Sequence, residues 1–587
     1  MGNSSSSISP YTVHVKTGDR KGAGTDATVK IRLISKEGQV SNELKLSRFW
    51  KNDHERGQID SFPMGLSELS FDFSDIDKLE LWRDSFGLGD NWYLDLITIE
   101  NNKTKQMFHF PAQRWIKADT RYVFRHYDTS LPQYDDCPEQ RNEELLSKKR
   151  LYEYAVNFSG APAQVKKLPE DESFSDSYKW DIVVNKMNLL KESRVLSAVS
   201  GVREYFESFG DLKKLYRQTS TMGVPISMRN WTNDLWFAIQ RLQGCNPVLL
   251  ALATRIPPNL NVDPDVVKEL LGGLSLDSAV KAQRIFIVDL KILGNLPCPE
   301  GRKVCSPIAL FYLDEKRQDL LPLCIQLFQI PSGDNPVFYP TDPPYAWLLA
   351  KMWYNNADAA YHQSCTHLGF THLMMEGIAV CTHRNLSPSH PLFKLLAPHF
   401  LFLLAINTRG LQKLINPGGW VDKTTTMGCN GMFEIVKRGV KAWRLDVHAV
   451  PAVEIARRGV LDKTVLPYYP YRDDAVAVYE AIEKYVKSMV EHFYDSPEKV
   501  EEDGELQSWA AELVKSKKRG GCGIRGVPGN GKFTDVEQII VTMTAIISTC
   551  SLGHAAANFN QYDEYGFPPN YPGILCGQVP TQKVLFK

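Results

Sequence analysis

Three histidines lie five residues apart in the stretch "HQSCTHLGFTH", at His362, His367 and His372. Neutral imidazole is a common ligand for transition metals. In an ordinary α-helix, residues five apart point about 140° away from each other, so His367 and His372 could not face one ion. A π-type turn brings such residues to one side, and these turns concentrate at functional sites. The spacing therefore favours a widened, metal-binding helix, with hydrogen-bonded core histidines as the alternative.

A second apolar stretch, "IISTCSLGHAAANFNQYD" at 546–563, carries His554 and Asn558 four residues apart on one helical face. Buried polar side chains need partners, and a metal shared with His367 and His372 supplies one. Three imidazoles and a weak amide oxygen form a ligand set without thiolate. This set suits a redox-capable iron better than structural zinc, which prefers closed, cysteine-rich sites.

The framework that holds these stretches is expected to have two parts, because 587 residues are too many for one core. From residue 11 to about 127, apolar and polar residues alternate between Gly- and Asp-bearing turns, which predicts an antiparallel β-sandwich. Its alternating runs are Val13–Val15, Val29–Leu33, Leu69–Phe73, Leu79–Leu81 and Leu94–Ile99.

The rest of the chain shows helical periodicity and predicts a large, mainly α-helical domain. The clearest helical stretches are 264–274, 344–381, 392–416, 476–494 and 536–558. The expected fold class is therefore a multidomain β + α protein.

The composition excludes several classes of protein. Lys plus Arg and Asp plus Glu both number 68, without a long basic block, so no nucleic-acid partner is expected. The eleven cysteines contain no CxxC pair, which fits free thiols in a reducing compartment such as the cytosol. The segment "GVPGNGKFT" at 526–534 mimics a phosphate-binding loop, but Phe533 replaces the required Ser or Thr, so nucleotide binding is not expected.

The membrane signals in the sequence are weak. The N-terminus lacks the apolar core of a signal peptide, and the longest apolar runs are too short to span a bilayer. Gly2 and Ser6 fit the N-myristoylation pattern, while a frayed serine-rich tail is an equal alternative.

Over residues 11–577 the chain resembles the animal lipoxygenases. The resemblance implies that His367, His372 and His554 bind a non-haem iron, with Asn558 as a weaker fourth ligand. His362 matches a histidine that is not a ligand. The motifs stand in the family's order: "WLLAKMWYNNADAAYHQSCTHLGFTHLMMEG" at 347–377, "HPLFKLLAPH" at 390–399, "YYPYRDD" at 468–474 and "HAAANFNQYD" at 554–563.

Further residues match the surroundings of the family's iron. Gln363 and Glu376 resemble partners that orient the ligating imidazoles by hydrogen bonding. The family's fifth protein ligand is a C-terminal main-chain carboxylate of Ile or Val, reached after a further helical stretch. This sequence ends instead at "PTQKVLFK", so the expectation is a catalytic domain that is incomplete at its C-terminal end.

The resemblance implies a dioxygenase of polyunsaturated fatty acids such as arachidonate. In this family a ferric hydroxide abstracts a bis-allylic hydrogen from a cis,cis-1,4-pentadiene, and dioxygen adds to the radical to give a hydroperoxide. Two alternatives stay open for this chain. It could be a catalytically silent membrane-binding protein with the same fold, or a hydroperoxide isomerase.

Apolar residues near the ligands are expected to line the substrate cavity, namely Leu368, Phe370, Ile406 and Leu414, although plain core packing explains each equally well. By resemblance, Leu414 lies near the reacting carbon. Gly410 occupies the position where lipoxygenases that make R-hydroperoxides usually carry Gly rather than Ala, so an R product is expected. A close helix contact is the alternative reason for a glycine there.

Residues 11–125 resemble the lipoxygenase PLAT domain, which implies calcium and membrane binding. They would follow a flexible N-terminus at 1–10 and precede a catalytic domain at 126–587. Trp50 and Phe86 are the residues expected to insert into a membrane. Oxygen-bearing groups in loops suit calcium, with ordinary turn residues as the alternative. The candidate calcium ligands are Gly24, Asp26, Asn52, Asp53, Glu55 and Asp90.

Overall fold

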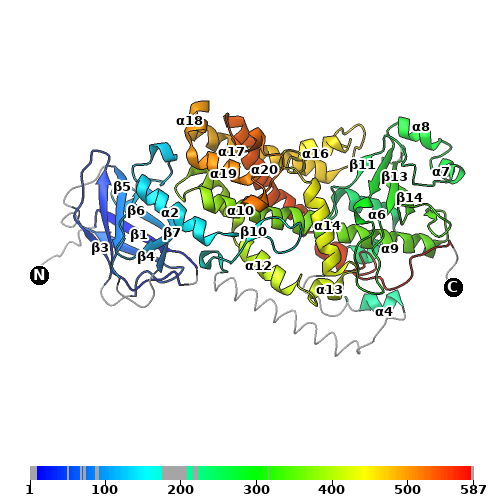
Figure 1. Cartoon of the computed structure of the whole chain (residues 1–587), viewed down its shortest axis with the longest axis horizontal. Helices are drawn as coiled ribbons and strands as arrows, with labels where there is room; N and C mark the ends of the chain where they lie inside the picture. The colour runs from blue at the N-terminus through cyan, green and yellow to red at the C-terminus, as the bar shows by residue number, and fades with distance from the viewer. Residues whose placement is uncertain are drawn as a thin grey trace, which may run out of the picture.

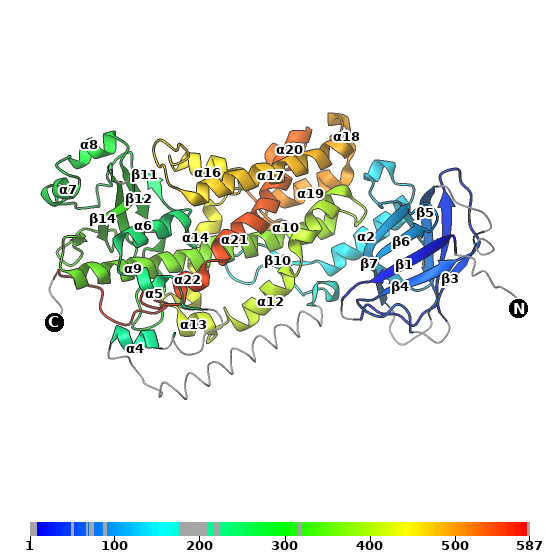
Figure 2. The same ribbon diagram turned by 180° about the vertical axis from the view of Figure 1, so that it is seen from behind.

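The computed structural model of the chain has a β-sandwich at one end, a helical body in the middle and a five-stranded sheet toward the other end (Figures 1 and 2). This arrangement confirms the predicted β + α fold class. The residues that the structure describes are 9–20, 22–48, 52–65, 69, 75–85, 91–174, 208–214, 216, 223–314, 316 and 318–583.

The β-sandwich pairs two antiparallel four-stranded sheets, with strand orders β4-β1-β6-β7 and β3-β2-β5-β8. Alternate residues of each strand are buried, as Val13 and Val15 in β1 are, and they meet in one core between the sheets. The strands are β1 Tyr11–Thr17, β2 Val29–Ser35, β3 Leu44–Leu46, β4 Ile59–Met64, β5 Ile76–Arg83, β6 Asn91–Asn101, β7 Met107–Lys117 and β8 Tyr122–Arg125.

One expected strand of the sandwich, Leu69–Phe73, can be compared with the structure only at its first residue. Leu69 is buried but helical, and the rest of the expected run, 70–73, lies outside the described residues. Alternation of apolar residues predicts which side chains are buried, but a short run does not distinguish a strand from a helical turn.

The helical body confirms the predicted helical stretches, with interruptions. The stretch 344–381 is one continuous helix, whereas the stretch 392–416 breaks at Phe402, which has a left-handed φ of 60°. The helices are α2 Pro138–Leu151, α4 Phe209–Lys214, α5 Ser227–Asn230, α6 Asp234–Gln243, α7 Pro264–Leu270, α8 Leu276–Lys281, α9 Pro344–Tyr361, α10 Met374–Asn385, α11 Pro391–Leu396, α12 Leu403–Lys413, α13 Trp420–Thr424, α14 Gly428–Ala442, α15 Leu445–His448, α16 Pro451–Arg457, α17 Pro470–Phe493, α18 Pro497–Glu502, α19 Gly504–Val514, α20 Val536–Ser548, α21 His554–Asn558 and α22 Gln561–Tyr565, with the π-helices η4 His362–Leu373 and η8 Thr549–Gly553.

A five-stranded antiparallel sheet in this domain was not predicted. Its strands are β11 Ala251–Leu252, β12 Ile285–Asp289, β13 Ile308–Leu313, β14 Leu320–Gln326 and β15 Val337–Phe338, and a separate pair joins β9 Tyr154–Ala155 to β10 Gln164–Val165. Most residues of β13 and β14 are buried on both faces. Such strands lack alternation, so their sequences cannot be told from buried helix segments.

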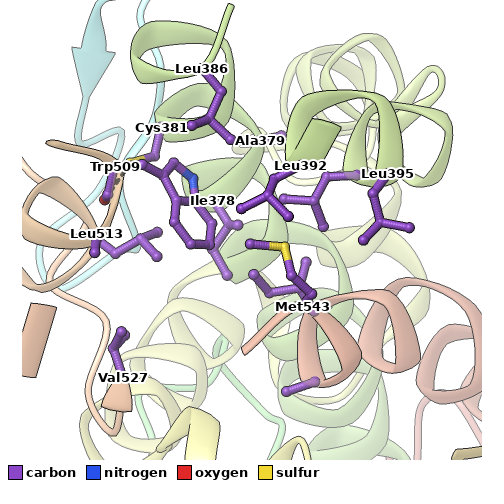
Figure 3. Packing of buried hydrophobic residues seen from close by; sticks show 14 of the residues in the cluster. Ile378, Ala379, Cys381, Leu386, Leu392, Leu395, Trp509, Leu513, Val527 and Met543 are labelled. Atoms are coloured by element: carbon purple, nitrogen blue, oxygen red, sulfur yellow. Dashed lines mark hydrogen bonds between the residues drawn. The ribbon is translucent and has the colours of Figure 1, made fainter. Parts of the chain in front are cut away.

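The core of the helical body packs around α10, which continues directly from η4. Figure 3 shows Trp509 of α19 and Met543 of α20 pointing toward Ile378 of α10. The Trp509 indole also donates a hydrogen bond of 3.1 Å to the Thr382 hydroxyl. The helix that carries the first histidines is therefore fixed by neighbours from distant parts of the sequence.

Buried ion pairs join the sandwich to the helical body. Arg114 of β7 donates to Ser389 Oγ and to Asp128, both at 2.9 Å. Arg114 also pairs with Glu144 of α2 at 2.8 Å, and Arg141 of α2, 4% exposed, pairs in turn with Glu505 of α19 in the helical body. These contacts hold the two parts in a defined orientation.

Two helical stretches, Pro391–Lys413 and Val536–Tyr565, are long and apolar enough to cross a membrane by length and composition alone. Half or more of each apolar window is buried inside the protein, which is typical of core helices. All eleven cysteines are free thiols, as expected.

Candidate metal centre

The predicted widening of the first histidine helix is confirmed, because His362–Leu373 forms the twelve-residue π-helix η4. Gly369 suits this geometry: a Cβ there would lie only 2.9 Å from the Ser364 carbonyl oxygen. The wide turn brings His367 and His372 together, with ring centroids 5.0 Å apart.

His554 approaches the same point from the helix that follows a second π-helix. Helix α20 continues as the π-helix η8, Thr549–Gly553, and α21 follows with His554 as its first residue. The potential ligand atoms of His367, His372 and His554 all lie within 4.8 Å of one another. Across the part of the chain that the structure describes, this is the only group of three or more His, Cys, Asp or Glu side chains that could hold a metal.

The tautomer of His372 follows from Asn407, a residue that the sequence analysis did not select. Asn407 Nδ2 donates to Glu376 Oε2 at 2.7 Å and to the His372 carbonyl oxygen at 3.1 Å. Its Oδ1 is therefore the atom that faces His372 Nδ1 at 2.9 Å, and this ring nitrogen must donate. Nε2 of the neutral ring then keeps a free lone pair, and it faces His554 Nε2 at 3.1 Å.

Glu376 contacts none of the three ring nitrogens. Its carboxyl group accepts hydrogen bonds from Asn407, from the Val165 amide and from Gln164, so it acts on His372 only through Asn407. Burial raises the pKa of Glu376 to about 7.

A glutamine chain surrounds His367. Gln363 Nε2 donates to Gln561 Oε1 at 3.0 Å, which turns Gln363 Oε1 toward His367 Nδ1 at 3.5 Å. Gln561 Nε2 in turn donates to Asn558 Oδ1 at 3.0 Å. Gln561 thereby connects two of the expected ligands, and nothing in the local sequence singles it out.

The electrostatics of the site keep all three imidazoles neutral. Burial, reinforced by the neighbouring histidines, lowers the pKa of His367 to about 2. Burial and His554 lower the pKa of His372 to about 4, and burial lowers that of His554. Neutral imidazoles with free lone pairs are the form that binds a transition metal, so the donor set fits iron.

His362 is a hydrogen-bonded core residue. Its Nδ1 lies 2.7 Å from the Tyr565 hydroxyl and its Nε2 lies 2.8 Å from the Ala557 carbonyl oxygen. Both ring nitrogens are occupied, which agrees with the expectation that it is not a ligand.

The expected cavity residues do not share one wall. Phe370 lines a cavity of about 530 Å³ whose described lining includes neither Leu368, Ile406 nor Leu414. Ile406 and Leu414 are 38% and 48% exposed. A Cβ on Gly410 would meet nothing within 4 Å among the described residues, so no close contact with a described helix explains this glycine.

The calcium candidates can be followed only in part. A Cβ on Gly24 would lie 3.3 Å from the His54 carbonyl oxygen, so the loop that carries Asp26 packs against the loop around Glu55. Asp26 and Asn52 are exposed, whereas the Asp53 carboxylate is bound by Arg48. Trp50, Phe86 and Asp90, like Gly2 and Ser6, lie outside the described residues.

Known proteins resemble this chain along nearly its whole length. A lipoxygenase family model matches residues 224–585, and a PLAT/LH2 domain model matches residues 11–129. The allene oxide synthase-lipoxygenase protein of Plexaura homomalla is 34% identical over 98% of this chain, which spans only 56% of that relative. A human polyunsaturated fatty acid lipoxygenase is 30% identical over 98% of this chain and 86% of its own length.

Solved structures agree with this relationship. The crystal structure of coral 8R-lipoxygenase, described with calcium activation through a C2-like domain, has a TM-score of 0.85 and 33% identity, covering 98% of this chain and 86% of that one. A lipoxygenase crystal structure in complex with arachidonate has a TM-score of 0.86, also with 33% identity and the same coverage. The chain belongs to the lipoxygenase family, with a PLAT/LH2 domain ahead of the lipoxygenase domain.

Proposed function

We propose that this protein is a non-haem iron lipoxygenase that converts a polyunsaturated fatty acid into a hydroperoxide. The observation that carries the proposal is the convergence of three neutral imidazoles, two from the π-helix η4 and one from the first residue of α21, directly after the π-helix η8. His367, His372 and His554 would hold the iron, with Asn558 as a weaker ligand. When bound, ferric iron supplies the oxidant that removes a bis-allylic hydrogen.

The surrounding residues hold the ligands in the form that binds iron. Asn407 fixes His372 with its Nδ1 protonated, and Gln363 Oε1 and Gln561 Nε2 both lie 3.5 Å from His367 Nδ1 and fix the orientation of that ring. Such hydrogen bonds set ring orientation and ligand basicity. The apolar helices around them exclude water and keep the imidazoles from taking up protons.

The substrate would lie on the α12 side of the histidines. Gly410 and Leu414 belong to this side, and the open space beside Gly410 leaves room for dioxygen near one end of the pentadiene. An R-configured product from an arachidonate-like acid is therefore the expected outcome. Leu414 would contact the chain near the reacting carbon.

The β-sandwich would bring the enzyme to its lipid substrate. Calcium at Gly24, Asp26, Asn52, Asp53, Glu55 and Asp90 would draw the loops to anionic headgroups, with Trp50 and Phe86 inserting. In this proposal the protein is cytosolic and binds membranes reversibly. Calcium binding by Asp53 would require its carboxylate to leave Arg48.

The test measures iron content, oxygen uptake and conjugated-diene formation with arachidonate, in the presence of calcium and vesicles. His367→Ala should lose iron and turnover, whereas His492→Ala, an exposed histidine on α17, should lose neither. Chiral analysis of the hydroperoxide then tests the role of Gly410.

Other results would replace the proposal. Consumption of a fatty acid hydroperoxide without oxygen uptake would make the protein a hydroperoxide isomerase. Vesicle binding without iron or turnover would make it a silent membrane-binding member of the family.

A further inference from the structure

A cavity of about 530 Å³ lies beside the two π-helices, and the lipoxygenase reaction proposed above does not use it. Its floor includes Phe370 and Thr371 of η4 and Leu552 of η8, and Trp443 and α16 form further walls. We call it the α16 cavity. Its volume lies within the range of roughly 300–1,000 Å³ that is usual for small-molecule sites.

The α16 cavity does not coincide with the expected substrate side of the iron site. None of the three clustered histidines contributes to its described lining, and neither Gly410 nor Leu414 does. The threonines at its floor are already committed: Thr366 Oγ1 donates to Asn246, and Thr371 Oγ1 donates to the His367 carbonyl oxygen. Thr549 Oγ1 likewise donates to the Ala545 carbonyl oxygen, whereas Ser548 Oγ has no partner among the described residues. This end of the cavity is therefore apolar apart from one hydroxyl group.

The other end of the cavity, lined by the end of α9, the start of α17 and α16, is polar. Tyr361 and Tyr471 both line the cavity, and neither hydroxyl has a hydrogen-bond partner among the described residues. Neither hydroxyl oxygen is among the buried polar atoms without a partner, so both face the space of the cavity, where they can donate to an occupant.

The charges near these hydroxyls favour an anionic acceptor. Arg457 and Arg458 both bind Glu454, and all three line the cavity. Lys291 also lines it, and its ammonium group has no partner in the described part of the chain. Lys291 and the two arginines outnumber the carboxylates Asp289 and Glu454 in the lining, three to two.

We propose that the α16 cavity binds a long-chain monocarboxylate at a site separate from the substrate site. The carboxylate accepts hydrogen bonds from the hydroxyls of Tyr361 and Tyr471, close to Arg457. The acyl chain extends over Phe370 and Trp443 toward Leu552. Because the floor consists of the π-helices, the occupant contacts the backbone that sets the spacing of the histidines.

Stearate is a suitable probe, because it has no pentadiene and is not consumed. Equilibrium dialysis of labelled stearate against the full iron-loaded chain measures binding without turnover. Tyr361→Phe and Tyr471→Phe should each weaken one class of sites roughly tenfold, since each removes a hydrogen bond to a charged group. Tyr485→Phe, an exposed tyrosine on α17 outside the cavity, is the matched control and should bind as the unmodified chain does.

Two further measurements distinguish a loss of carboxylate binding in the α16 cavity from a loss of binding in the substrate site. Methyl stearate lacks the charge, so its binding should be the same in all four proteins. The KM for arachidonate should stay unchanged in the two cavity variants. Unchanged stearate binding in both variants, or a KM that rises in parallel with the stearate dissociation constant, would overturn the proposal; the second result would make the cavity the substrate pocket.

Discussion

Replacing Asn407 tests how the iron ligands are oriented. In Asn407→Ala, the His372 Nδ1 proton loses its acceptor and Glu376 loses one of its three donors. The ring of His372 then has no partner that fixes its tautomer. We expect weaker iron binding as well as a less stable fold.

The magnitudes follow from the hydrogen bonds removed. Loss of a hydrogen-bonding partner behind a metal ligand typically costs 10- to 100-fold in metal affinity, or about 1.4–2.7 kcal/mol. Asn407 makes three buried hydrogen bonds, of 2.7, 2.9 and 3.1 Å. At about 0.5–1.5 kcal/mol each, their loss should lower the free energy of unfolding by about 2–4 kcal/mol.

The assay combines chelator competition for iron with urea unfolding of the same preparations. Asn407→Asp keeps an oxygen opposite His372 Nδ1 but loses both donors, so it should retain iron better than Asn407→Ala while being similarly destabilised. Asn385→Ala removes a buried amide of α10 that bonds the Cys381 carbonyl oxygen, so it should lose stability without losing iron affinity. Equal iron affinities in Asn407→Ala and Asn385→Ala would refute the role given to Asn407.

Further predictions concern four other residues. Gly410→Ala should raise the free energy of unfolding by about 0.5–1 kcal/mol, because the methyl group meets no neighbour within 4 Å, and should shift the product from R toward S on chiral chromatography. The pKa of Glu376 is raised from 4.5 to about 7, so the stability that its protonated form contributes is complete below about pH 4.5 and is lost as the pH rises to 7. Glu376→Gln should remove about 3 kcal/mol of the change in unfolding free energy between these pH values, measured by urea unfolding. An unchanged pH dependence of the unfolding free energy would contradict this prediction. Arg141→Leu leaves Glu505 buried without its main partner and should cost about 3–5 kcal/mol in thermal unfolding, partly restored in the double variant with Glu505→Leu. Asp26→Asn should weaken calcium-dependent binding to anionic vesicles, whereas Asp265→Asn on α7 should not, and equal binding of both would remove Asp26 from the calcium site.

The pairing of His367 and His372 could be predicted from the sequence because it depends on a local feature, their spacing. Two imidazoles five residues apart are incompatible with one face of an α-helix, and this conflict predicted the π-helix η4. The π-helix η8 left no such signal, since only one histidine follows it and the pair His554 and Asn558 has ordinary helical spacing. A ligand pair marks a π-helix only when it spans the widened turn.

Asn407 and Gln561 were missed for a different reason. Each is a polar residue in a helical stretch, and its role depends on which helix packs opposite it. Contacts such as Asn407 with His372, 35 residues away, are set by tertiary packing and not by local sequence. The same holds for the five-stranded sheet, whose strands are apolar on both faces.

The two π-helices meet at two small residues beside the histidine cluster. Gly369 permits the wide turn of η4, and Gly553 ends η8 where a Cβ would lie 3.8 Å from Thr371 Cγ2 of the facing helix. Thr371 in turn bonds the His367 carbonyl oxygen. Thr371 therefore links the crossing of the two helices to the backbone of His367, and Gly553 directly precedes His554. A shift at this crossing would move His554 relative to His367 and His372, so we expect the packing of the π-helices, and not only the identity of the histidines, to affect iron binding at the proposed site.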